Sequence, residues 1–264
     1  MSIVNTEPSA FRVVVEVRPP RRPSLVGARR QIERIVSFAH SILIPENPLG
    51  VPTVSSLAVA REVLELGGTP VVCLNARDRN LLGLRRDLLT AVAAGVNDLL
   101  FVQGDPAPDC APTGLTVRSM VKESRRFAEE HRVGPLNIAV TSRLQALVSW
   151  KRDADQLFVQ ASFSLDALLA WRDSISFEGP VCVGVIVPPS VARAHRWSAE
   201  LPGVEVPPNW IEALEKDPLA GVELACDLAE AIAESKAFDG IHLIPGIRYR
   251  EVAEQIESRR RLGT

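Results

Sequence analysis

Two carboxylates stand where apolar stretches of the chain end, and each could donate a proton or bind a polar ligand. Glu16 lies within VVVEVRPP, a segment built largely of valine, where an unpaired buried carboxylate is unfavourable unless it has a use. Burial favours the protonated form of a carboxyl group, so Glu16 could act as a general acid near neutral pH. The alternatives are a surface-facing position on an alternating strand, or an ion pair with Arg18 or Arg21.

The second carboxylate, Asp105, belongs to the segment VQGDPAPD. This segment ends the apolar run 99–102 with Gly104 and Pro106, which are turn-forming residues. Asp105 is therefore expected at the mouth of whatever its strand builds. Its side chain could reach inward to a ligand, or it could bond to its own backbone in an Asx turn.

Short β-branched runs alternate with longer helical patterns along the chain, and this alternation predicts the elements that position the two acids. We predict strands over 11–17, 37–44, 70–75, 98–103, 136–141, 155–160, 181–187 and 240–245. We predict helices over 26–36, 55–67, 81–94, 116–131, 143–151, 164–175, 190–199, 217–236 and 248–260. Several strands are apolar along nearly their whole length, which is typical of a parallel sheet covered on both faces.

Eight strands, each followed by a helix, predict an α/β fold of the (β/α)8 TIM barrel type. We expect one domain over residues 1–264, with 1–10 as a flexible N-terminus. A doubly wound open sheet is the alternative. That fold would need a glycine-rich phosphate turn, and the chain contains neither GxGxxG nor GxxxxGK[ST].

Composition excludes several classes of partner. The net charge of -2 argues against nucleic acid or an anionic membrane as the main partner. No apolar stretch is long enough to span a bilayer, and the first residues lack the pattern of a secretion signal. The four cysteines lack metal-ligand spacing, so we expect no metal site and a reducing, cytoplasmic location. The oligomeric state is open.

Active sites of such barrels lie at the carboxyl ends of the strands, and this chain has polar residues at those positions. They are Glu16, Asn47, Asn75, Gln103, Asp105, Thr141 and Gln160, followed by Pro245–Gly246. Within NARDRN (75–80), Arg77 and Arg79 could bind an anionic tail, or Asp78 could cap the next helix. The four histidines share no spacing and no triad context, so nucleophilic hydrolysis has little support.

Several segments, in chain order, resemble the methylenetetrahydrofolate reductase family. VEVRPPR is similar to the opening FEFFPP of that family, and its third, fourth and sixth strands resemble CLNARDRN, LLFVQGDP and ADQLFVQASFS. A longer similarity follows the seventh strand, and SILIPENPLG resembles the TDNPLG segment of divergent branches. The resemblance covers about residues 12–250 and implies a TIM-barrel reductase that acts on folate.

The resemblance also implies roles for individual residues. Glu16 matches the general acid that protonates N10 of the folate, Asp105 lies close to the pterin, and Gln160 hydrogen-bonds it. Trp197 falls where the family has a phenylalanine that stacks on substrate. We assign Asn75 to the substrate as well, and to the cofactor Asn47, Arg77, Asp78, Gln103 and Thr141. One of Arg77, Arg79 and Arg248 could receive the anionic glutamate tail of the folate.

The residues that the family uses to hold FAD are mostly replaced. Cys73 stands where the family has histidine, Thr141 begins the segment that replaces Tyr-Pro-Glu, and Lys151 and Arg152 are poor substitutes for the phosphate-binding residues. The expected activity is reduction of 5,10-methylenetetrahydrofolate to 5-methyltetrahydrofolate by NADH or NADPH, without tightly bound flavin. Weakly bound FAD or a deazaflavin is another hydride donor. The alternative function is a non-catalytic folate-binding or partner subunit that retains the pterin site.

Overall fold

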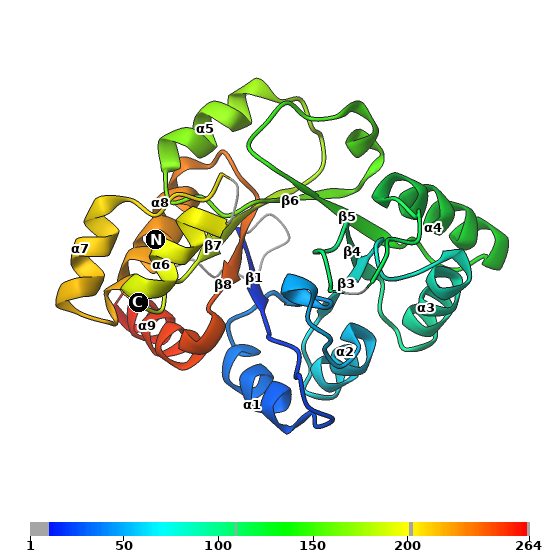
Figure 1. Ribbon diagram of the computed structural model, residues 1–264, viewed down its shortest axis with the longest axis horizontal. Helices are drawn as coiled ribbons and strands as arrows, with labels where there is room; N and C mark the ends of the chain where they lie inside the picture. Colours follow the sequence, from blue (N-terminus) through cyan, green and yellow to red (C-terminus); the bar gives the residue numbers. More distant parts are fainter. Residues whose placement is uncertain (1–10, 109, 201–202, 263–264) are drawn as a thin grey trace.

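Runs of valine, isoleucine and leucine form the strands of this chain, because such side chains fit a pleated, buried backbone. The computed structural model describes residues 11–108, 110–200 and 203–262. The strands are β1 (Arg12–Glu16), β2 (Ser41–Ile44), β3 (Pro70–Asn75), β4 (Asp98–Val102), β5 (Asn137–Ser142), β6 (Gln156–Val159), β7 (Val181–Ile186) and β8 (Gly240–Ile244). They form one closed parallel barrel in sequence order (Figure 1). The predicted single-domain (β/α)8 barrel is confirmed; the predicted flexible segment 1–10 lies outside the described residues.

Helices follow the strands and cover the barrel from outside (Figure 1). They are α1 (Val26–Ile35), α2 (Ser56–Glu65), α3 (Leu81–Ala93), α4 (Val117–His131), α5 (Leu165–Ser174), α6 (Val191–Glu200), α7 (Pro208–Lys216), α8 (Ala220–Ser235) and α9 (Tyr249–Leu262). Short 3-10 helices are η1 (Pro48–Gly50), η2 (Ser149–Asp153) and η3 (Gly246–Arg248). At the start of α4, Thr116 and Ser119 form a capping box. Their side chains accept hydrogen bonds from backbone N–H groups that have no partner within the helix.

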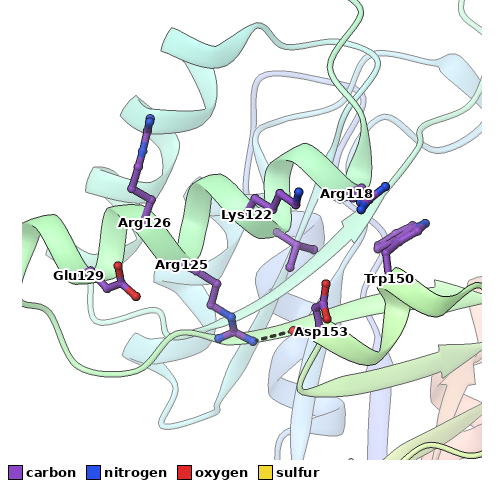
Figure 2. Close-up of a pocket in the computed structure, with 8 residues that line it drawn as sticks. Arg118, Lys122, Arg125, Arg126, Glu129, Trp150 and Asp153 are labelled. Atoms are coloured by element: carbon purple, nitrogen blue, oxygen red, sulfur yellow. Dashed lines mark hydrogen bonds between the residues drawn. The ribbon is translucent and has the colours of Figure 1, made fainter.

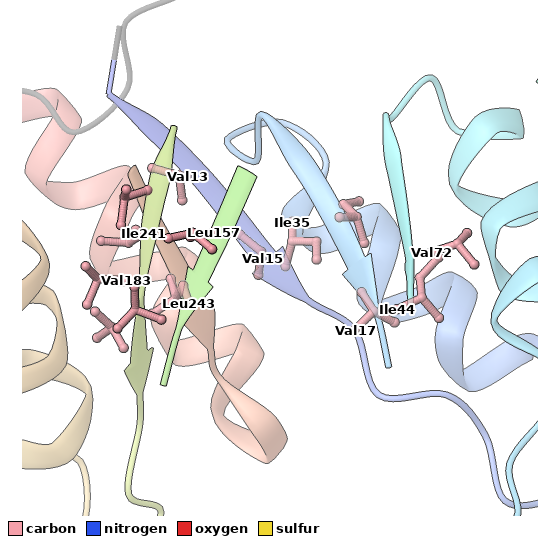
Figure 3. Packing of buried hydrophobic residues seen from close by; sticks show 14 of the residues in the cluster. Val13, Val15, Val17, Ile35, Ile44, Val72, Leu157, Val183, Ile241 and Leu243 are labelled. Carbon is pink, nitrogen blue, oxygen red and sulfur yellow. The ribbon is translucent and has the colours of Figure 1, made fainter. Parts of the chain in front are cut away.

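Side chains alternate between the two faces of each strand, and each face has its own apolar cluster. The inner cluster fills the barrel with Val14, Leu43, Val71, Cys73, Leu100, Ala139, Phe158 and Cys182. The outer cluster packs between strands and helices, and Figure 3 shows Val13 and Val15 of β1 in it together with Ile35 of α1. The acids and amides at strand ends are therefore held by a barrel that is packed on both sides.

The barrel closes where β1 pairs with β8, with Arg12 opposite Gly240. A Cβ on residue 240 would lie 2.4 Å from the carbonyl oxygen of Arg12, so only glycine allows the two backbones to approach this closely.

Two predicted elements begin three or four residues before the observed ones. The strand predicted over 37–44 begins at Ser41, because the N–H groups of Phe38 and Ala39 donate to the carbonyl of Ile35 and extend the turn that ends α1. The helix predicted over 217–236 begins at Ala220. A separate helix, α7, precedes it and was not predicted, because its start at Pro207-Pro208 looks like a loop.

The helix predicted over 143–151 is wrong. Residues 143–148 form no helix, and only the five-residue η2 follows them. After β5 the chain must run back along the length of that strand, which is about 20 Å. A helix over 143–151 would rise by only about 14 Å, which is too short. The carbonyl of Gln145 accepts a hydrogen bond from the indole of Trp171 at 2.9 Å, which fixes the extended path.

The environments of the cysteines predict their reactivity. Burial raises the pKa of Cys73, Cys182 and Cys226 to about 12 each, so these thiols stay protonated at pH 8, whereas Cys110 is exposed. Because only the thiolate reacts, an aromatic disulfide reagent at pH 8 should modify one thiol per native chain quickly. Cys110→Ser should abolish this fast phase, and all remaining thiols should react in denaturant. Two fast thiols in the native protein would contradict the assignment.

Candidate functional site

Glu16 ends β1 on the inner face of the barrel. Val14, two residues earlier, belongs to the cluster that fills the barrel, and alternation puts Glu16 on the same side. Its side chain is 19% exposed, so the carboxyl group is largely buried and still open to a ligand. Within the described residues it forms no ion pair with Arg18 or Arg21, which removes that alternative.

The imidazole of His242, in β8, is the immediate neighbour of the Glu16 carboxylate. Nε2 lies 3.3 Å from Glu16 Oε2, at ion-pair distance but without hydrogen-bond geometry, and Nε2 is buried. The ring packs edge-on against Phe158, with centroids 5.6 Å apart. His242 pairs with Val14 in the sheet, two residues before the acid. His242 was not selected from the sequence. Its place in the last strand was the signal that could have found it, because alternate residues of a strand face the barrel interior.

Asn75, predicted to bind substrate, ends β3 and is fully buried in a hydrogen-bond network. Its amide nitrogen donates to Glu46 Oε2 at 2.8 Å and to Asp78 Oδ2 at 3.0 Å. Asn47 Nδ2 donates to the same Asp78 oxygen at 3.0 Å. Glu46, which was not selected from the sequence, also accepts from the backbone N–H of Asn75 at 2.8 Å. These bonds join the loops after β2 and β3 at the carboxyl end of the barrel.

Asp78 does not cap the helix after β3, contrary to that interpretation of NARDRN. The cap is Asn80, whose side chain accepts from the N–H of Gly83 at 2.8 Å. Asp78 instead accepts the side-chain bonds from Asn47 and Asn75. A carboxylate held by two amides stabilises the loops and places negative charge at this end of the barrel.

Arg79 is not available for an anionic ligand, which corrects its assignment to the folate tail. Its side chain is 8% exposed, lies 2.7 Å from Glu46 and 3.2 Å from Asp87, and is neutralised by both. Arg248 is also bonded, to Glu251 at 3.1 Å and to two backbone carbonyls. Of the three arginines named for the tail, Arg77 alone forms no ion pair in the described structure; it donates to a backbone carbonyl at 3.2 Å.

Asp105 follows β4 and is exposed, and it bonds to another loop. Its Oδ2 accepts the backbone N–H of Leu49 at 2.7 Å. This oxygen therefore does not form the Asx turn that was the alternative for Asp105. The carboxylate links the loop after β4 to the loop after β2 and keeps its second oxygen for another partner.

The other predicted site residues lie at different depths. Thr141, in β5, and Gln103, after β4, are exposed at the carboxyl end of the barrel. Gln160 follows β6, is half-buried, and donates its backbone N–H to Ser142 at 2.8 Å. Trp197 lies on α6, half-buried against the outer cluster. The ligand roles assigned to these four residues stay predictions.

The candidate cofactor residues do not fit a tightly held FAD. Asn47 and Asp78 are bonded to each other, and the Asp78 carboxylate would repel a pyrophosphate. Arg77 is bonded to a backbone carbonyl. Between β5 and β6, burial and the nearby Arg143 lower the pKa of Lys151, which makes its ammonium form less favourable than that of a lysine in water. We assign no step to FAD.

A separate groove of about 400 Å³ lies outside the barrel, between α4 and η2 (Figure 2). It exists because no helix packs there. Arg118 and Lys122 line it and form no ion pair within the described residues, but Glu129 and Asp153, which also line it, form none either. Arg125 and Arg126, which line it too, are paired with Asp155 and Glu123, so the unpaired charges of the groove balance. It is no candidate for the acid chemistry of Glu16.

Two further observations concern the whole described chain. No helix within 11–108, 110–200 or 203–262 has the length and apolar character needed to cross a membrane. Over the same ranges, no group of three or more histidine, cysteine or acidic side chains gathers where it could hold a metal ion. The absence of a metal cofactor stays a prediction.

The fold and the site together define a (β/α)8 barrel with a largely buried acid at its carboxyl end. No protein-family model matches the chain, and no curated protein does. A solved structure of an uncharacterized protein from Clostridium thermocellum, which binds two copies of 5-methyl-5,6,7,8-tetrahydrofolic acid, is similar with a TM-score of 0.66 and 12% identity over 94% of this chain and 96% of that chain. A mutant tryptophan synthase alpha-subunit from Pyrococcus furiosus has a TM-score of 0.57 and 12% identity over 93% and 96%. At this identity the similarities establish the fold alone.

Proposed function

We propose that this chain binds a reduced folate at the carboxyl end of its barrel and reduces 5,10-methylenetetrahydrofolate to 5-methyltetrahydrofolate. The observation that carries the proposal is Glu16, an acid 19% exposed on the inner face beside His242. The similar barrel from Clostridium thermocellum, which binds 5-methyl-5,6,7,8-tetrahydrofolic acid, supports the class of ligand. The segments around Glu16, Asp105 and Gln160 that resemble folate reductases support the reaction.

In this proposal Glu16 donates its proton to N10 of the folate. The bond between N10 and the bridging methylene carbon breaks, its electron pair stays on N10, and the carbon is left as an iminium with N5. Hydride then adds to that carbon and gives the N5 methyl group. Gln160 contacts the pterin and Trp197 stacks on the substrate, while Asp105 and the buried Asn75 position the loops around them.

The hydride donor in this proposal is NADH or NADPH, which reacts as a second substrate and leaves after each turnover. The exposed Gln103 and Thr141, with Arg77, are the described groups assigned to it. Asn47 and Asp78 were assigned with them, but their bond to each other makes them supports of the loop. A protein that uses a dissociable hydride donor does not need to bind FAD tightly.

A non-catalytic folate-binding subunit is the second candidate. The observation that favours it is the similar barrel from Clostridium thermocellum, which is described by what it binds. Such a protein would retain the site for the pterin and would depend on a partner for electron transfer or methyl transfer.

The proposed activity predicts that the purified protein is colourless and oxidises NADH or NADPH when 5,10-methylenetetrahydrofolate is present and no flavin is added. The measurement is a visible spectrum followed by loss of absorbance at the reduced nicotinamide band. Omitting the folate is the control and should stop the oxidation. A yellow protein would favour FAD. A colourless protein that binds 5-methyltetrahydrofolate without oxidising NADH or NADPH would establish the second candidate instead.

A further inference from the structure

The loop after β2 crosses the end of β3 and docks on the loop after β4. We call residues 45–55 the β2 loop and residues 103–108 the β4 loop. The crossing follows from the strand order, because β3 lies between β2 and β4 and the backbone N–H of Leu49 still reaches Asp105 Oδ2 at 2.7 Å. The turn η1 in this loop is the light-blue helical segment drawn between the labels of β1 and β3 in Figure 1.

The β2 loop holds a backbone conformation that its side chains disfavour. Asn47, Leu49 and Gly50 have φ angles of 45°, 60° and 67°, in the left-handed region. For a non-glycine residue this region costs about 1–2 kcal/mol, and leucine lacks the polar side chain that helps asparagine there. Such strain persists where surrounding contacts enforce it, and it concentrates at ligand-binding sites.

The contacts that enforce this conformation are specific. The Asp105 carboxylate fixes the N–H of Leu49, and Asn47 Oδ1 accepts the N–H of Thr53 at 3.1 Å. A Cβ on Gly50 would lie 2.0 Å from the carbonyl oxygen of Pro106, so the two loops meet backbone to backbone. The conformation of the β2 loop is thus set by the β4 loop.

In this conformation of the β2 loop, Leu49 is 63% exposed at the carboxyl end of the barrel. An exposed, strained leucine contributes little to the core. Ile247, after β8, is 61% exposed at the same end, so two loops at the barrel mouth carry an exposed apolar side chain. A strained residue that exposes an apolar side chain at the barrel mouth points to a ligand contact, because small-molecule sites are lined largely by apolar side chains.

We propose that Leu49 packs against the aminobenzoyl ring of a folate bound at the barrel mouth, and that Asp105 holds Leu49 there. The inference rests on the proposed function, in which Glu16 protonates N10, the atom that carries the aminobenzoyl ring. The β2 loop runs from the strand next to β1 to the β4 loop, so it borders the barrel mouth at which Glu16 lies. Leu49 is then a specificity-determining residue and Asp105 a positioning residue.

The test measures binding of 5-methyltetrahydrofolate by calorimetry for wild type, Leu49→Ala and Leu49→Gly. Loss of a partly buried leucine contact should weaken binding about fivefold to tenfold in both variants. Leu49→Gly should keep the melting temperature of the wild type, because glycine adopts positive φ without strain and the side chain is not part of the core. Leu82→Ala removes a leucine that is 75% exposed on α3 and should bind as the wild type does.

A second pair of variants tests the part that Asp105 plays. Asp105→Asn keeps an oxygen that can accept the N–H of Leu49, so it should bind within about twofold of wild type, whereas Asp105→Ala should lose about fivefold. Equal loss in both variants would overturn the positioning role, because the carboxylate charge would then be what the folate contacts.

The outcomes separate this inference from the proposed function. A wild-type chain that does not bind 5-methyltetrahydrofolate removes both. A wild-type chain that binds it, with Leu49→Ala and Leu49→Gly binding equally well, overturns the contact with Leu49 alone and leaves the folate site in place.

Discussion

Glu16→Gln is expected to slow the reduction of methylenetetrahydrofolate at saturating substrate by about 100-fold to 10,000-fold, the usual range for loss of a general acid. Glutamine has nearly the same size and keeps a hydrogen-bonding group, but it has no proton to donate to N10. The KM for the folate should therefore stay within about threefold of wild type, because the interaction removed is made in the transition state. Oxidation of NADH with saturating folate measures the change.

The control for this variant is Glu130→Gln, since Glu130 is 60% exposed on α4 and belongs to no site. It should keep the wild-type turnover rate. A Glu16→Gln protein whose turnover rate stays within about threefold of wild type would remove the acid role. A large rise in KM with an unchanged turnover rate would move Glu16 from proton transfer to binding.

Arg79→Ala is expected to destabilise the fold by about 3–5 kcal/mol, because it leaves the buried Glu46 carboxylate without its cation and Asp87 with Arg86 alone. Glu46 and Asp87 have side chains only 13% and 11% exposed, so water cannot replace the guanidinium. Domains of this kind have total stabilities of about 5–15 kcal/mol, and the midpoint of urea unfolding should fall clearly. Arg79→Lys should recover part of the loss, since it restores the charge without the two-pronged geometry.

Arg61→Ala is the matched control, because Arg61 pairs with Glu65 at 3.1 Å but is 77% exposed. Solvent screens such a pair, so the change should be below about 0.5 kcal/mol. If the free energy of unfolding of Arg79→Ala lay within about 1 kcal/mol of the wild-type value, the network around Glu46 would not stabilise the β2 loop.

The sequence was sufficient for most of the fold, because hydrophobic periodicity reports directly which face of each element is buried. It failed where geometry overrides local pattern. Leu144 and Leu147 suggest a helix by their spacing, yet both pack half-buried from an extended chain that must span the length of β5. Pro207 and Pro208 suggest a loop, yet Pro208 occupies the first turn of a helix, where a missing N–H is harmless.

Some residues of the candidate site could be predicted from the sequence, and others could not. Glu16 stands out in sequence because a carboxylate among valines needs an explanation. Its neighbour His242 does not stand out in the sequence, because the contact between the two residues depends on the register of β1 with β8. The partners of Arg79 and Asp105 depend on a loop with positive φ angles, which no periodic pattern reports.

The pairing of β1 with β8 has a consequence for how the protein acquires activity. Arg12 meets Gly240, so closure needs the two ends of the chain to find each other, and contacts this distant in sequence form slowly because ordering the intervening chain is entropically expensive. His242 reaches Glu16 through that same contact. A chain that has not closed its barrel therefore has the acid without its neighbour. Recovery of activity after dilution from denaturant would then follow barrel closure.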